Sequence, residues 1–174
     1  TCVVIDGSNV IHSGSGDSNK MSLQRILSTQ LAVEKLGWPT LLAMKQGTFD
    51  AAQNDGSNPK RPASLTTKER NELNRMNEMG LLTLIHTPKK HGPDGKAAGI
   101  DDEFLIKTAI LKNGWILSND KYRDHIRELK NAGHNELADE IQKRWIQLTF
   151  VGNDSTPIFE LPRNGASKID TEVE

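Results

Sequence analysis

The sequence predicts an α/β protein, with a mostly parallel sheet of about five strands and helices on both faces of that sheet. Short apolar segments rich in β-branched residues alternate along the chain with longer segments whose apolar residues recur at helical spacing. Strands separated by helices favour parallel pairing, because a parallel pair needs such a crossover connection. At 174 residues the chain is long enough to form one domain with a sizeable core.

The strands are predicted from their β-branched and aromatic content. The first, 3–5, is followed at once by Asp6-Gly7-Ser8-Asn9. Further strands are predicted at 40–44, 81–85, 115–118 and 147–151, with a short edge strand at 158–159. In a parallel sheet the carboxyl ends of the strands border the crevice in which ligands bind. The polar residues after the first strand are therefore candidates for function.

The helices are predicted from apolar spacing and from their end signals. Ser22 is placed as the N-cap of a helix that ends at Gly37. Thr66 and Glu69 form a capping box for a helix that runs to about Met79. The next helix opens at Asp101, and one or two helices fill 122–144 with a break near Gly133.

Three segments are predicted to lack regular structure. The stretch 46–64 is rich in Gly, Asn, Ser and Pro and reads as a long exposed loop, which is typically functional or disordered. A basic loop with Gly and Pro spans 89–96. The polar tail 162–174 is predicted to be disordered, which leaves 1–161 as the folded domain.

Composition narrows the function classes. No apolar run approaches the ~20 residues of a membrane span, so no membrane association is expected. A single cysteine excludes an internal disulfide and suits a reducing compartment, for which we expect the cytoplasm, with the nucleus as the alternative. A net charge of -1 is not that of a strong nucleic-acid binder. Any such affinity would come from local basic patches or from other domains or proteins.

Several carboxylates are predicted to converge at one edge of the sheet. Asp6 and Asp120 follow strands, and Asp101 and Asp102 open a helix. Asp124 lies one helical turn after Asp120, on the same face of its helix. Clustered like charges repel, and such a cluster persists when a cation lies between its members. Oxygen ligands without thiolates or paired histidines select Mg²⁺, or Mn²⁺ in its place, over zinc.

Each of these acids also has a purely structural interpretation. Asp101 and Asp120 could cap helices, and Asp102 could be another favourable acid of a first helical turn. Asp124 could pair with Arg127, and Asp6 with Asn9 could form a tight turn. The functional interpretation depends on the convergence of all of them.

Three blocks of sequence, 4–10, 100–104 and 117–124, resemble the catalytic blocks of the Regnase (MCPIP) ribonucleases, in the NYN branch of the PIN-like nucleases. Residues 84–88 are also similar to that family, and the resemblance extends over 3–151. It implies a PIN-like three-layer α/β/α sandwich and a Mg²⁺-dependent endoribonuclease of RNA decay or processing, with 5′-phosphate and 3′-hydroxyl products. The implied catalytic site comprises Asp6, Asn9, Asp101, Asp102, Asp120 and Asp124, with the five aspartates as metal ligands.

The chain departs from that family in three ways. It has no CCCH zinc finger, so the RNA affinity of that module is missing from this sequence. The loop before Asp101 ends in Ala97-Ala98-Gly99 and is less basic than expected. The stretch 46–64 has little similarity to the family and could alter substrate choice.

Phosphodiester hydrolysis needs charge neutralisation and a deprotonated water, both of which a Mg²⁺ held by Asp6 and Asp120 could supply. Asp101 or Asp102 could hold a second ion or orient a bound water, and the sequence leaves one or two ions open. Asn9 would hydrogen-bond a metal-bound water or a carboxylate, and Ser8 and Ser118 are candidates for the same role.

Basic side chains near the predicted site are candidates for RNA contacts. They are Lys89, Lys90, His91, Lys96, Lys121 and Arg123, with Lys60 and Arg61 as an extension. Each could equally be ordinary solvated surface. Trp38, Trp115 and Trp145 could stack on bases, although core packing is the better interpretation of the last two. His86, His91, His125 and His134 are interpreted as surface or loop residues.

Two other functions compete with a nuclease. An aspartate-nucleophile phosphatase also places an aspartate after its first strand, but its second acid would stand where this chain has Ser8. A catalytically weak PIN-like scaffold that binds RNA or protein is the other alternative, and a homo-oligomer is compatible with either. Retention of every acid disfavours the scaffold.

Overall fold

The computed structural model describes residues 1–12, 20–86, 100–151 and 156–161, and only the backbone of residues 100 and 101. A five-stranded sheet has the order β3-β2-β1-β4-β5, and all its neighbours pair in parallel. Its strands are β1 (Val3–Asp6), β2 (Thr40–Lys45), β3 (Thr83–Ile85), β4 (Trp115–Ser118) and β5 (Trp145–Gln147). Two more strands, β6 (Thr149–Val151) and β7 (Thr156–Ile158), form a separate antiparallel pair.

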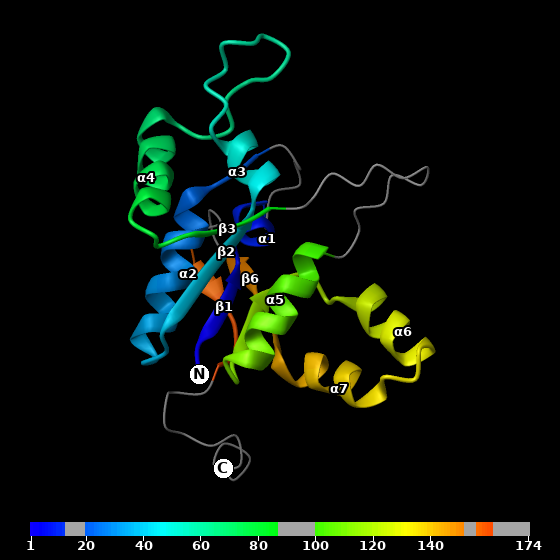
Figure 1. Cartoon of the computed structure of the whole chain (residues 1–174). Coiled ribbons are helices and arrows are strands. Elements are labelled where there is room, and N and C mark those ends of the chain that lie inside the picture. The colour runs from blue at the N-terminus through cyan, green and yellow to red at the C-terminus, as the bar shows by residue number, and fades with distance from the viewer. Residues whose placement is uncertain (13–19, 87–99, 152–155, 162–174) are drawn as a thin grey trace, which may run out of the picture.

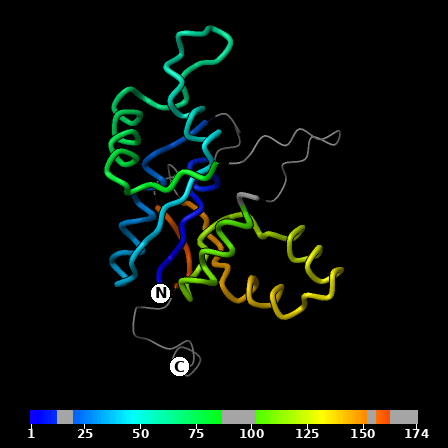
Figure 2. Tube along the Cα trace, in the orientation of Figure 1, coloured from blue at the N-terminus to red at the C-terminus, as the bar shows by residue number. Residues whose placement is uncertain are grey.

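Helices cover both faces of the five-stranded sheet (Figure 1). Four helices pack on one face of the sheet: α1 (Gly7–His12), α2 (Leu23–Lys35), α3 (Gln46–Ala52) and α4 (Thr67–Glu78). The other set is α5 (Ile100–Leu111), α6 (Arg123–Asn131) and α7 (Asn135–Arg144). The Cα trace shows α6 and α7 as a helical hairpin beside α5, away from α4 (Figure 2). The three-layer prediction is confirmed.

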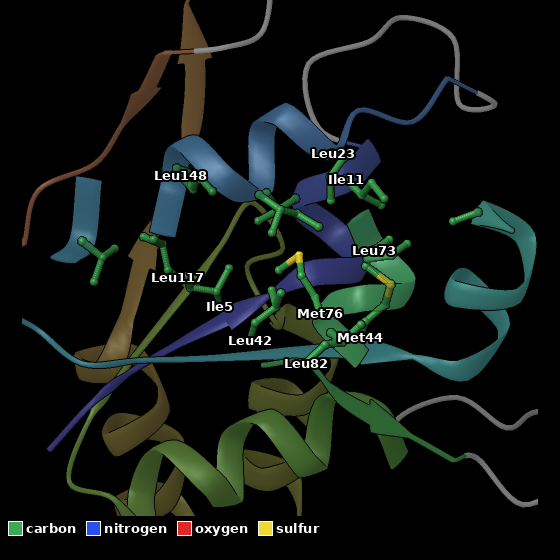
Figure 3. Packing of buried hydrophobic residues seen from close by; sticks show 14 of the residues in the cluster. Ile5, Ile11, Leu23, Leu42, Met44, Leu73, Met76, Leu82, Leu117 and Leu148 are labelled. Carbon is green, nitrogen blue, oxygen red and sulfur yellow. The ribbon is translucent and has the colours of Figure 1, made fainter. Parts of the chain in front are cut away.

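Alternation along the strands divides the core in two. Val3 and Ile5 pack with the α1–α4 side, together with Leu117 of β4. Figure 3 shows this cluster, in which α1, α2 and α4 contribute residues such as Ile11, Leu23 and Leu73. Val4 and Ile116 point to the opposite side, toward α5 and α7. Because strand side chains alternate with a period of two, Asp6 and Ser118 fall on that second side.

The structure confirms several of the predicted signals at helix ends. The Thr66 hydroxyl accepts the Glu69 N–H at 3.2 Å while the Glu69 carboxylate accepts the Thr66 N–H at 2.9 Å, so the capping box is formed. Gly133 has φ of 82° between α6 and α7, a left-handed conformation that glycine adopts without strain. Ser22 precedes α2 as predicted, but its side chain makes no capping hydrogen bond.

Three predictions of local structure were wrong. The stretch 46–64 is not a loop throughout, because α3 occupies 46–52 and buries Phe49 and Ala52 one turn apart. The predicted strand 147–151 is split between β5 and β6, which belong to different sheets and flank the buried Leu148. The edge strand predicted at 158–159 lies instead at 156–158 as β7.

A further helix was not anticipated: α1 begins directly after Asp6, where the sequence suggested only a turn. Within the described residues, no helix has the length and apolar character that crossing a membrane requires. The proposed disordered tail, 162–174, lies outside the described residues.

Candidate active site

Asp6 is the last residue of β1, and its carboxylate is enclosed by hydrogen-bond donors. Its Oδ1 accepts the Asn9 N–H at 3.1 Å, which makes Asp6 the cap of α1. Its Oδ2 accepts the hydroxyl of Ser118 at 3.0 Å and that of Tyr122 at 3.3 Å. The side chain is 6 % exposed. The position of Asp6 is therefore fixed by groups from α1, β4 and the segment after β4.

The residues after β4 are bound back to the end of β1. The Asp120 N–H donates to Ser118 Oγ at 3.0 Å, and the Asn119 N–H donates to Asn9 Oδ1 at 2.8 Å. The strand order reverses between β1 and β4, and such a switch point is where open α/β sheets bind ligands. The two central strands thus present their polar ends at one place.

A tight turn delivers Asp120 to this place. Its Oδ1 accepts the Tyr122 N–H at 2.9 Å, as in an Asx-turn. Tyr122 has φ of 49°, a left-handed conformation that costs a residue with Cβ of order 1–2 kcal/mol. The helix α6 therefore begins only at Arg123, and Asp120 is not on the same helix as Asp124. The prediction that both acids share one helical face was wrong for this reason.

A groove of about 780 Å³ lies along these residues, and we call it the acidic groove. Its lining includes Asp102, Asp120, Asp124 and Glu128, together with His125. Nε2 of His125 lies 3.1 Å from Oδ2 of Asp102, and the two side chains are 22 % and 23 % exposed. Tyr122 also lines the groove, and Asp6 lies behind it.

Burial dominates the electrostatics of Asp6. Desolvation raises the pKa of Asp6, and the negative charge of Asp102 raises it further. The hydrogen bonds from Asn9 and Ser118, and the charge of Lys45, oppose that rise. The pKa of Tyr122 is raised well above its usual value, first by burial and then by the charge of Asp6. Tyr122 is consequently a neutral phenol that donates to the carboxylate.

The residues between Asp6 and Asn9 hold α1 against β2. A Cβ on Gly7 would lie 2.8 Å from the carbonyl oxygen of Ala43, so the close approach requires glycine. The hydroxyl of Ser8 accepts the Lys45 N–H at 2.8 Å. Ser8 therefore joins α1 to the end of β2, whereas Ser118 contacts the carboxylate as the sequence suggested.

Most of the predicted site residues whose side chains the structure describes lie close together. Asp6, Asn9 and Asp120 are joined by the contacts above, and Asp102 is near enough for its charge to act on Asp6. Asp124 lies at the edge of the acidic groove, 80 % exposed, with Oδ1 at 2.7 Å from the Arg127 guanidinium. The structural interpretations thus hold in part for Asp6, Asp120 and Asp124, whose carboxylates cap or pair locally.

Some predicted residues cannot be placed. The side chain of Asp101 and the residues Lys89, Lys90, His91 and Lys96 lie outside the described part of the chain. Lys121 and Arg123 line the acidic groove, as a role in RNA contact requires.

The donor set at the acidic groove suits a hard divalent cation. Among the described residues, no three His, Cys, Asp or Glu side chains stand close enough together to enclose a metal. Mg²⁺ commonly keeps several waters and takes only one or two carboxylates from the protein. The carboxylates of Asp6 and Asp102 repel each other across this site, a cost that a cation would offset.

Three neighbours of the site were missed by reasoning from the sequence. The sequence predicts a helix start at Tyr122 and a surface position for His125, and it predicts no role for Lys45. No spacing signal distinguishes them, because each reaches the site through the turn after β4 or through the pairing of β1 with β2.

Comparison with known proteins identifies the family and the fold of this chain. A family model described as "Zc3h12a-like Ribonuclease NYN domain" matches residues 1–169. The Caenorhabditis elegans protein "Endoribonuclease rege-1" is 34% identical over 74 residues, which cover 42% of this chain and 11% of that protein. The chain thus matches only about a tenth of the length of this relative.

A solved structure, the Arabidopsis thaliana nuclear protein-only RNase P 2 (PRORP2), superposes with a TM-score of 0.61. The match covers 94% of this chain and 30% of that one at 19% identity, and it shows a shared fold. The family resemblance read from the sequence is confirmed, and the chain belongs to the Zc3h12a-like ribonuclease NYN domain family.

Proposed function

We propose that this domain is a divalent-metal-dependent endoribonuclease that hydrolyses phosphodiester bonds in single-stranded or stem-loop RNA, in RNA decay or processing. The observation that supports it best is the acidic groove at the carboxyl ends of β1 and β4, in a chain that belongs to a ribonuclease family. Nucleases of the NYN and PIN-like class generally depend on divalent metals.

Asp6, Asp102 and Asp120, with the predicted ligands Asp101 and Asp124, would hold the cation, one or two of them directly and the others through its bound waters. When bound, a divalent cation supplies polarisation of a phosphoryl oxygen and a bound water of lowered pKa. The protein's own groups orient the ligands. Ser118 and Tyr122 fix one oxygen of Asp6, and His125 contacts Asp102.

The phosphatase alternative loses further support. Its general acid would occupy the position of Ser8, whose hydroxyl accepts the Lys45 N–H between α1 and β2. A serine hydroxyl held at the end of β2 does not replace a carboxylic acid as the proton donor to a leaving group at Asp6. The scaffold alternative predicts RNA binding without cleavage, and only an activity assay distinguishes it.

The direct test uses a circular RNA and its linear stem-loop counterpart, incubated with Mg²⁺, Mn²⁺ or EDTA. Opening of the circle demonstrates an internal cut, because a circle has no end for an exonuclease. We expect cleavage with either metal, none in EDTA, and products with a 5′-phosphate and a 3′-hydroxyl.

Asp6→Asn and Asp102→Asn are expected to lower the cleavage rate by about a hundredfold or more, as loss of groups in a metal site does. Asp139→Asn is the matched control, because Asp139 is an exposed aspartate on α7. A circle that stays closed in both metals would refute the proposal, and so would Asp6→Asn cleaving as fast as Asp139→Asn.

A further inference from the structure

A second groove, of about 620 Å³, adjoins the acidic groove, and we call it the basic groove. Its charged lining residues are all cationic: Lys121, Arg123, Arg127 and Lys130. Ile126 and Trp145 add an apolar wall. Lys121, Arg123 and Arg127 line both grooves, so the two are continuous around the start of α6.

The cationic and acidic side chains of α6 lie on different faces of the helix. Arg123, Arg127 and Lys130 recur at i, i+4 and i+7 and share one face of the helix. Asp124 and Glu128 recur at i and i+4 on a neighbouring face, and both line the acidic groove. One short helix therefore presents only cations to the basic groove, and both carboxylates and cations to the acidic groove.

Few of the cationic side chains in the basic groove form ion pairs with carboxylates. Within the described residues, no ion pair joins Lys121, Arg123 or Lys130 to a carboxylate. Arg127 pairs with Asp124, but the two side chains are 69 % and 80 % exposed, and pairs so exposed are weak. These side chains can therefore turn to an anion at little cost.

Trp145 connects the basic groove to the site behind the acidic groove. Its Nε1–H donates to the Ser118 carbonyl at 3.2 Å, and the Ser118 hydroxyl donates to Asp6. This bond fixes the indole at the end of β4, partly exposed in the groove wall. An indole face beside a row of cations is the combination with which proteins bind single-stranded nucleic acid.

We propose that the basic groove binds the single-stranded RNA segment next to the cleaved bond, with phosphates on Arg127 and Lys130 and a base on Trp145. This inference rests on the proposed function, which puts the cleaved bond at the acidic groove. A chain of net charge -1 has no overall attraction for RNA, so a local row of cations of this kind would supply it.

The test measures binding without cleavage. A short oligouridylate is titrated into the domain in EDTA, and tryptophan emission and affinity are followed at several salt concentrations. We expect quenching that disappears in Trp145→Phe, because Trp38 and Trp115 lie outside the groove. Arg127→Gln and Lys130→Gln should each weaken binding and lower the log–log salt slope by about 0.7 per lost phosphate contact.

Lys143→Gln is the matched control: Lys143 is 73 % exposed on α7, pairs with Glu140 and does not line the groove. The groove proposal is overturned if Lys130→Gln and Lys143→Gln bind alike with equal salt slopes, or if emission does not respond to RNA. Groove-dependent binding by a protein that never opens the circular RNA would refute the proposed function alone. Cleavage without groove dependence would refute the groove alone.

Discussion

Replacing Ser118 by alanine tests whether the site is organised around this hydroxyl. Ser118 is fully buried at the end of β4. Its Oγ donates to Asp6 at 3.0 Å and accepts the Asp120 N–H at 3.0 Å. Alanine removes both bonds and leaves the two partners in place.

The expected loss in free energy of unfolding follows from these two hydrogen bonds. A hydrogen bond to a charged group contributes about 1.5–3 kcal/mol, and a buried donor left unpaired costs about 1–3 kcal/mol. Because the losses overlap, we expect the free energy of unfolding to fall by about 2–4 kcal/mol. For a domain of this size the melting temperature should fall by roughly 4–16 °C.

The loss of stability in Ser118→Ala should increase as pH rises. The folded-state pKa of Asp6 is raised by burial, so its contribution to stability is fully present at low pH and declines as pH rises through that pKa. The Ser118 hydroxyl opposes the rise. Its removal therefore raises the pKa of Asp6 further, and the difference in stability between the two proteins should grow from about pH 4 to about pH 8.

Urea unfolding in EDTA across this pH range measures the effect, with Ser28→Ala as control. The Ser28 hydroxyl donates to the Arg25 carbonyl within α2 and, among the described residues, does not touch the site, so its loss should change stability by about 0.5 kcal/mol or less. A Ser118→Ala protein that unfolds like Ser28→Ala, or whose deficit is the same at both ends of the range, would refute this reasoning.

Three further perturbations address other parts of the structure. Asp120→Asn keeps an oxygen for the Tyr122 N–H but removes a charge, so in EDTA its melting temperature should rise while cleavage is lost; a lower melting temperature would show that the carboxylate acts chiefly as a cap. Thr66→Ala removes the capping box and should cost about 1 kcal/mol in urea unfolding without changing cleavage, and a cleavage defect would contradict this. Gly7→Ala forces a Cβ against the Ala43 carbonyl and should cost about 1–3 kcal/mol, so an unchanged urea midpoint would show that the contact relaxes freely.

The parallel sheet and its helices were predictable because local signals agreed with the overall fold. Apolar β-branched runs marked the strands, the Thr66 capping box marked α4, and Gly133 marked the break between α6 and α7. The helix α3 was missed because only Phe49 and Ala52 anchor it in a polar segment. The division between β5 and β6 was missed because the pattern of 147–151 does not show where the chain changes sheets.

The approach of Asp6, Asp102 and Asp120 to one edge of the sheet was predictable, because each follows a strand or opens a helix and parallel topology gathers such positions at one edge. The groups that surround them were not. Tyr122 enters the site only because its left-handed backbone turns the chain after Asp120. His125 meets Asp102 only because the first turn of α6 comes close to the first turn of α5. Such contacts depend on tertiary geometry and leave no spacing in the sequence.

The bonds between Asp6 and Ser118 and between Asn9 and Asn119 join residues 112 and 110 positions apart in the chain. During synthesis the amino-terminal part of a domain emerges from the ribosome first. An emerging chain that lacks β4 has its first carboxylate but neither the hydroxyl nor the turn that completes the site. Under the proposed function, the domain would cleave no RNA until β4 and the turn after it have left the ribosome.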